Sequence, residues 1–72
     1  MSTTPDFGKR LRELRERAGM SQAELSRRAE VHAVNISKLE SGKYQPTWPV
    51  VIRLAAALEV TTLAFSAQHT AT

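Results

Sequence analysis

Two short amphipathic patterns follow each other within residues 22–39, with almost no linker between them. Apolar residues of this stretch fall at Leu25, Ala29, Val31, Ile36 and Leu39. The first two lie about one helical turn apart, as do the last two, so each half has one inward face. Val31 falls in the short break, where it can close the corner between two helices meeting at a steep angle. The pattern predicts the two crossed helices of a helix-turn-helix, although a generic helical hairpin uses the same spacings.

The chain before this stretch predicts one further helix, over about 7–18. Its inward stripe follows the i, i+4, i+7 pattern of a helix with one buried face and consists of Phe7, Leu11, Leu14 and Ala18. Thr4 or Asp6 is expected to cap the start of this helix, and Gly19 to end it.

Capping signals place the boundaries of the two crossed helices. Ser21 followed three residues later by Glu24 forms a capping box, so the second helix begins there. We expect it to run to about Ala29, and the third helix to cover about 32–41, up to Gly42.

The last third of the chain predicts two more helices. Thr47 can cap the first of them, with Pro49 in its first turn, where the missing N–H costs nothing. Its inward stripe is Val51, Leu54, Ala55 and Leu58. After a turn at 59–60, Thr61 caps a short helix over about 62–66, and 67–72 are expected to be disordered. The predicted fold is therefore all-α, a compact bundle of five short helices with the helix-turn-helix at 21–41.

Length and composition limit the possible classes of protein. The chain has 72 residues and no cysteine, so we expect one domain over 1–72, ordered from about 6 to 66, without disulfides or thiolate metal sites. His32 and His69 are far apart and lack ligand neighbours, which predicts no metal site. No apolar run is long enough for a membrane span, and the start lacks a secretory signal, so we expect a cytoplasmic, nucleoid-associated protein.

The positive charge is concentrated in one part of the chain. Nine of the ten Lys and Arg residues lie between Lys9 and Lys43, within a formal net charge of +3. Such asymmetry suits a face directed at a polyanion. The alternative is a solvated helix surface, because glutamates are interspersed among the basic residues.

Three segments, read in order, resemble a known family. LRELRERAGMSQAELSRRA, VHAVNISKLESGK and QPTWPVVIRLAAALEV are similar to the lambda-repressor-like, Cro/C1-type (XRE) helix-turn-helix DNA-binding domains, over about Phe7 to Phe65. Two positions depart from the family pattern. Ser26 stands where the family often has Ala, and Glu30 where it often has Gly, so Glu30 is expected to adopt an unfavourable left-handed conformation.

The outer face of the third helix is expected to read the bases. At 100° per residue, Ile36, Leu39 and Glu40 face inward, and the N-terminal tip of the helix points to base edges in this motif. The candidate base-reading residues are His32, Ala33, Val34, Asn35 and Lys38. An amide can pair with adenine, a lysine can reach guanine or a phosphate, and apolar groups can pack on thymine methyls.

Three of these positions have ordinary structural alternatives. Single exposed apolar residues such as Val34 are common on protein surfaces. Asn35 can serve as a local capping residue in the first helical turn. His32 can be the N-cap of the helix rather than a base or phosphate contact.

A second group of residues is expected to bind phosphates, which gives affinity and register rather than sequence preference. Ser21 and Gln22 begin the second helix, whose free N–H groups favour an anion, and the resemblance implies this role most clearly for Gln22. The residues expected to bind the backbone beyond the third helix are Ser41, Lys43 and Tyr44. Arg10 and Arg27 are outer candidates, with solvated surface as the alternative.

The resemblance also implies an ion pair between Arg15 and Glu40 that ties the first helix to the third. Trp48 is expected to have a core or subunit-contact role rather than to stack on bases. Val60, Leu63 and Phe65 are candidates for a two-fold dimer contact, with ordinary monomer core as the alternative.

Together these features predict a sequence-specific double-stranded DNA-binding transcriptional regulator. We expect a repressor that binds an inverted-repeat operator as a homodimer, with its third helix in the major groove. The alternative is an antitoxin-like or adaptor protein whose main partner is another protein. We expect no enzyme, cofactor or small-molecule ligand, because the sequence has no nucleophile–base–acid set, glycine-rich phosphate loop or metal-ligand cluster.

Overall fold

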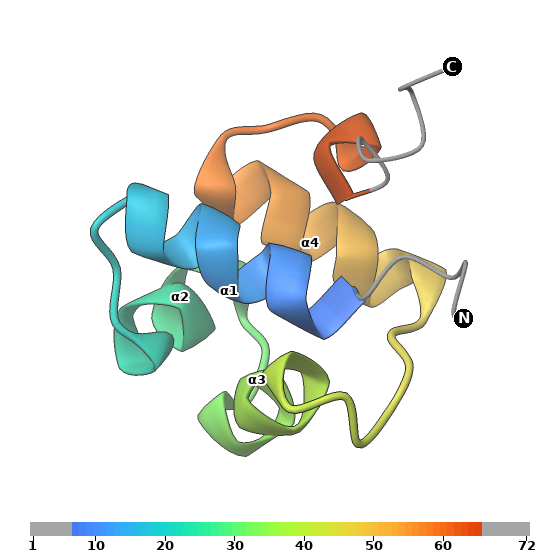
Figure 1. The fold of residues 1–72 in the computed structure, drawn as a ribbon. Helices are drawn as coiled ribbons and strands as arrows, with labels where there is room; N and C mark the ends of the chain where they lie inside the picture. The colour runs from blue at the N-terminus through green and yellow to red at the C-terminus, as the bar shows by residue number, and fades with distance from the viewer. Residues whose placement is uncertain (1–6, 66–72) are drawn as a thin grey trace.

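The computed structural model describes residues 7–65, which form four α-helices and a final 3-10 turn at 62–65 (Figure 1). The helices are α1 (Phe7–Arg17), α2 (Gln22–Ala29), α3 (Ala33–Glu40) and α4 (Trp48–Leu58). The all-helical prediction is confirmed, with the fifth element a 3-10 turn rather than an α-helix. The expected caps at Thr4 and Asp6 and the expected disorder at 67–72 lie outside the described residues.

The core draws its fully buried side chains from all four helices. Leu11, Leu25, Ile36 and Leu54 are 0% exposed, and Leu39 is 1% exposed. They come from the stripes that the apolar periodicity predicts. The inward stripe of α1 is shorter than predicted, because Ala18 lies beyond the end of this helix and is exposed.

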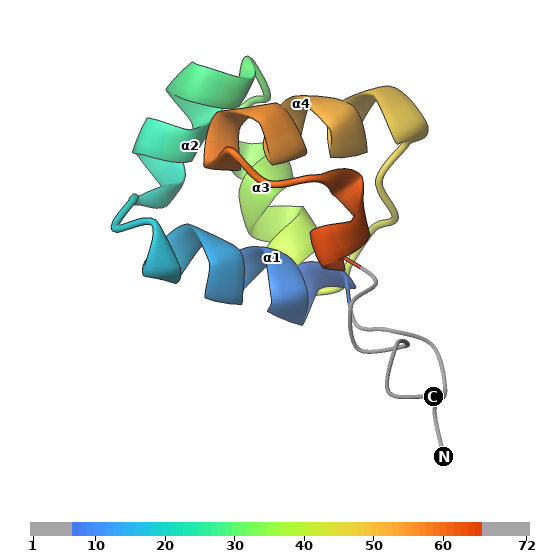
Figure 2. The ribbon, with the colours of Figure 1, turned by 90° about the horizontal axis from the view of Figure 1, so that it is seen from above.

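The arrangement leaves one side of α3 open. α1 packs against α3, and α2 packs against both α3 and α4. Figures 1 and 2 together show α3 below α1 and α4, at one edge of the molecule. Its upper side therefore contributes to the core, and its lower side faces away from the other helices.

A close backbone approach joins the start of α1 to the end of α3. A Cβ atom placed on Gly8 would lie 2.1 Å from the Leu39 carbonyl oxygen and 2.8 Å from the Glu40 carbonyl oxygen. Only a residue without a side chain fits at this distance. The apolar pattern of the sequence carries no sign of this contact.

Two helices end on a glutamate in the left-handed conformation. Glu30 has φ 58° and ψ 42° at the end of α2, as expected from the departure at this position. Glu59 has φ 60° and ψ 42° at the end of α4, where the sequence predicts only a turn. After Glu30 the chain turns at once into α3, and Val31, 6% exposed, closes the corner as predicted.

The 3-10 turn at 62–65 folds back against α1. The rings of Phe65 and Phe7 stack with centroids 4.8 Å apart, and Phe65 is 5% exposed. The Arg10 Nε donates to the Ala64 carbonyl oxygen at 2.8 Å. Two expectations therefore change. Phe65 belongs to the core of the protomer rather than to an exposed dimer surface, and Arg10 holds the C-terminal turn instead of facing outward toward a phosphate.

Within residues 7–65, no helix combines the length and the apolar character needed to cross a membrane.

Candidate nucleic-acid interface

The outward face of α3 carries the residues predicted to read bases. His32, Ala33, Val34 and Lys38 are exposed, and Asn35 is half-buried. The apolar Val34 is 59% exposed. The opposite face of the helix is occupied by Ile36 and Leu39, which anchor it in the core. Four of the five predicted residues are therefore exposed on α3 or at its N-cap, and Asn35 is exposed in part.

The His32 side chain takes no part in capping α3. His32 is the N-cap residue, with φ −56° and ψ 141°, but its side chain makes no capping hydrogen bond. Its backbone carbonyl accepts instead from the N–H groups of Asn35 at 2.9 Å and Ile36 at 3.1 Å. The imidazole at the tip of α3 is thus available for an external partner.

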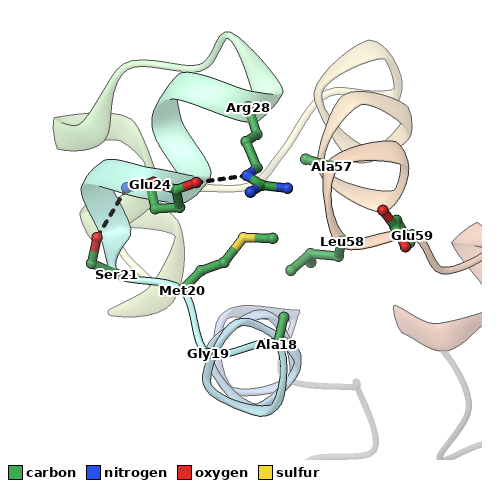
Figure 3. Close-up of a pocket in the computed structure, with 9 residues that line it drawn as sticks. All are labelled: Ala18, Gly19, Met20, Ser21, Glu24, Arg28, Ala57, Leu58 and Glu59. Carbon is green, nitrogen blue, oxygen red and sulfur yellow. Dashed lines mark hydrogen bonds and ion pairs between the residues drawn. The ribbon is translucent and has the colours of Figure 1, made fainter.

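The start of α2 has one half of the predicted capping box. The Ser21 Oγ accepts a hydrogen bond from the Glu24 backbone N–H at 3.0 Å (Figure 3). The Glu24 carboxylate does not make the reciprocal hydrogen bond of a capping box, to the Ser21 backbone N–H. It pairs with Arg27 and, at 2.7 Å, with Arg28. Hydrogen bonds from Arg28 and then Arg27 lower the pKa of Glu24 from its ordinary value of 4.5.

Gln22, the first residue of α2, connects the expected phosphate site to α3. Its Nε2 donates to the Glu40 Oε1 at 3.1 Å. A side-chain amide has two N–H donors, so the second hydrogen remains usable by an anion at the start of α2. No feature of the sequence pattern predicted the contact with Glu40.

Arg15 and Glu40 form the ion pair that the family resemblance implies. The Arg15 Nε lies 2.6 Å from the Glu40 Oε2, and the Nη2 donates to the Oε1 at 3.0 Å. A third bond, from the Nη1 to the Met20 carbonyl oxygen, measures 2.8 Å. The two side chains are only 12% and 5% exposed. The hydrogen bond to Glu40 raises the pKa of the Arg15 guanidinium, and the pair fixes α1 to the end of α3.

The loop after α3 places the remaining phosphate candidates beside the helix end. The Ser41 Oγ donates to the Lys38 carbonyl oxygen at 3.1 Å, and the Lys43 backbone N–H donates to the same oxygen at 2.9 Å. Gly42 between them has a φ of 79°. Ser41, Lys43 and Tyr44 are all exposed, on the same end of α3 as Lys38.

A separate groove of about 730 Å³ lies between the end of α1, α2 and the end of α4. In Figure 3, Met20 and Leu58 point toward each other across it, and Arg28 extends over one side. Two of its charged residues, Glu24 and Arg28, pair with each other. Among the residues that the structure describes, no group of three or more His, Cys, Asp or Glu side chains is placed to hold a metal ion.

Comparison with known proteins defines the class of this chain. A family model described as a helix-turn-helix domain matches residues 6–64, so the chain belongs to the helix-turn-helix family. A search of functionally characterised proteins found no match.

A solved structure of another protein is similar over most of both chains. It is the crystal structure of the restriction-modification controller protein C.AhdI from Aeromonas hydrophila, with a TM-score of 0.82 and 30% sequence identity. The match covers 85% of this chain and 92% of the other. The predicted Cro/C1-type helix-turn-helix domain is thereby confirmed, and the chain is a DNA-binding transcription regulator.

Proposed function

We propose that this chain is a sequence-specific repressor that binds an inverted-repeat operator as a homodimer and has no enzymatic activity. The observation that carries the proposal is the open face of α3. Its inner side chains are fully buried, whereas Val34, 59% exposed, contributes nothing to the core. A β-branched apolar residue slightly lowers helix propensity, so its exposure is best explained by contact with an apolar partner such as a thymine methyl.

The neighbouring side chains give this face the chemistry needed to distinguish base pairs. Asn35 supplies an amide with both a donor and an acceptor, and Lys38 supplies a cation. Phosphate contacts at Gln22 and Lys43, both beside the C-terminal end of α3, would fix the helix in register. Repression follows from occupation of the operator, which excludes other proteins from the same DNA.

The homodimer proposal rests on apolar groups that the protomer leaves at its surface. Leu63 is 73% exposed and Trp48 is 63% exposed. Val60, three residues before Leu63, is partly buried against the core. Since Phe65 is buried, the dimer contact is now assigned to Leu63 and the exposed edge of Val60, with Trp48 as an additional subunit contact.

Selection from a random duplex pool with purified protein at about 150 mM salt tests the proposal. We expect enrichment of an inverted repeat whose half-sites are about 10–11 base pairs apart, the spacing of successive major grooves. Val34→Ala, Asn35→Ala and Lys38→Ala should each relax selection at different positions of the half-site. Failure to enrich any sequence, with only weak salt-sensitive binding, would favour the antitoxin-like or adaptor alternative.

A further inference from the structure

A small polar groove adjoins the open face of α3. It has a volume of about 290 Å³ and lies where α1, the start of α2 and the end of α3 meet. It is lined by Arg12, Arg15, Gln22, Ser37, Glu40 and Ser41. Ser37 and Ser41 are exposed members of α3 and its C-cap, so the groove opens beside the face proposed to enter the major groove.

The charges in this groove leave one cation in excess. Arg15 and Glu40 form its inner part, are 12% and 5% exposed, and neutralise each other. The Arg12 side chain is 65% exposed and supplies a second guanidinium. With Gln22 contributing its second amide hydrogen, the groove offers several donors to an anion.

Arg12 is held in the free protein by a contact that an anion can replace. Its Nε lies 3.2 Å from the Glu16 Oε2, one helical turn along α1, and the Glu16 side chain is 57% exposed. Exposed pairs of this kind are weak, because water screens both charges. A phosphate can accept two parallel hydrogen bonds from one guanidinium and is therefore a stronger partner.

We propose that this groove binds one phosphodiester of the duplex, with Arg12 as its charged ligand, and that Glu16 competes for Arg12 and so limits DNA affinity. Gln22 is an additional donor to the same phosphate. The inference rests on the proposed function, since it requires α3 to lie against DNA. It adds a contact that the apolar and charge patterns of the sequence did not indicate.

Salt titrations of duplex binding by Arg12→Gln and Glu16→Gln test this assignment. Arg17→Gln is the matched control, because it removes the same charge from the same helix at a position about 140° around the axis. Arg12→Gln should weaken binding to every sequence roughly fivefold at about 0.15 M salt and reduce the log–log salt slope by about one. Glu16→Gln should tighten binding by about twofold, and Arg17→Gln should change neither quantity comparably.

Two outcomes separate this inference from the proposed function. If the wild-type protein binds duplex but Arg12→Gln keeps its affinity and salt slope, the groove assignment is wrong and the regulator proposal stands. If the wild-type protein binds no duplex, both fail. Thermal melting of each variant confirms that it is folded, which is expected because Arg12 and Glu16 are exposed.

A neutral methylphosphonate introduced at each phosphate of the selected operator locates the contact. At one phosphate position, the methylphosphonate should weaken binding by the wild-type protein and have little effect on binding by Arg12→Gln. The absence of any such position contradicts the proposal. Melting of the DNA-free protein in phosphate and in chloride of equal ionic strength tests a free anion as the ligand. Stabilisation by phosphate that Arg12→Gln abolishes and Arg17→Gln retains, together with no methylphosphonate position that depends on Arg12, would assign the groove to a free anion and overturn the duplex assignment.

Discussion

At the scale of single residues, two contacts fix the position of α3. The Arg15–Glu40 pair holds the end of α3 through charge, and the Gly8 backbone contact holds the same end through shape. Gln22 adds a third connection by donating to Glu40 from α2. Because all three act near the C-terminal end of α3, they determine the angle at which its outer face is presented.

Removing the Glu40 carboxylate should therefore affect both stability and binding. Glu40→Ala leaves Arg15 nearly buried without its partner and should lower the free energy of unfolding by about 3 kcal/mol. DNA affinity should fall as well, because α3 loses its tie to α1. Urea unfolding and duplex titration measure the two effects. Glu13→Ala, which removes an exposed partner of Arg10, is the control and should change unfolding little. Unchanged melting of Glu40→Ala would contradict the structural role.

Gly8→Ala tests packing against helix propensity, since the two effects have opposite signs. Propensity alone predicts that alanine stabilises a helix by up to about 1 kcal/mol relative to glycine. The Cβ would lie 2.1 Å from a backbone oxygen of α3, so the helices must move apart. We expect a net loss of about 2 kcal/mol or more in the free energy of unfolding, measured by urea denaturation. A stabilised Gly8→Ala protein would show that α1 and α3 are less closely packed than described.

At the scale of elements, α2 is short and depends on its ends. Its start is capped by Ser21, its first turn carries Glu24, and its end is a glutamate in the left-handed conformation. A helix of eight residues has little stability of its own in water, so these terminal features and its packing against α3 and α4 maintain it. The sequence departs from its family pattern at the left-handed position, Glu30, where stability can be regained.

Glu30→Gly should stabilise the protein. Glycine adopts a φ of 58° without the Cβ penalty, so the gain is expected to be about 1 kcal/mol. Glu30→Ala is the matched control, because it removes the same carboxylate but keeps the Cβ, and it should give no comparable gain. Thermal or urea unfolding measures both variants. If both variants gain equally, the effect comes from the lost charge and not from the backbone.

Acid should weaken α2 through Glu24. The folded pKa of this carboxyl is lowered from 4.5 by its hydrogen bonds to Arg28 and Arg27. Its contribution is therefore fully present above about pH 4.5 and is lost as the pH falls through the lowered folded pKa. Because Glu24 is exposed to solvent, we expect a small effect. A carboxyl titration by NMR should place the Glu24 pKa below its ordinary value and show it rising in Arg28→Gln; an unshifted pKa in the wild-type protein would contradict the pairing.

At the scale of the whole molecule, the basic half and the apolar C-terminal part have different expected partners. Most Lys and Arg residues precede α4, together with the open face of α3. Leu63 follows α4 and is one of the most exposed apolar side chains of the described residues. Under the proposed function, one surface meets DNA and another meets a second copy of the chain.

Leu63→Glu should shift the protein toward monomer. A carboxylate in an apolar two-fold contact is desolvated and faces its own copy, so both charges oppose association. We expect a lower sedimentation coefficient at concentrations where the wild-type protein is dimeric, and loss of tight binding to two half-sites with single half-site binding retained. Val34→Glu is the control for sedimentation only, because it places the same charge on a different exposed surface. An unchanged oligomeric state in Leu63→Glu would exclude this surface.

The sequence by itself determined the elements and their inward faces. The 3.6-residue periodicity placed Leu11, Leu25, Ile36 and Leu54 in the core, because burial of one stripe is a local property that spacing records. Glycine and capping residues set the helix ends to within about two residues. The family resemblance implied the Arg15–Glu40 pair, and the departure at Glu30 indicated the left-handed turn.

Apart from the Arg15–Glu40 pair, only the tertiary structure decided which side chains meet across elements. The sequence made Phe65 a candidate for a dimer contact, with the monomer core as the alternative. In the structure, the turn at 62–65 folds Phe65 onto Phe7. Arg10, a candidate phosphate contact in the sequence, donates a hydrogen bond to the Ala64 carbonyl oxygen. Arg12 lines the groove beside α3. These outcomes depend on the distances between residues far apart in the chain, which no local period encodes.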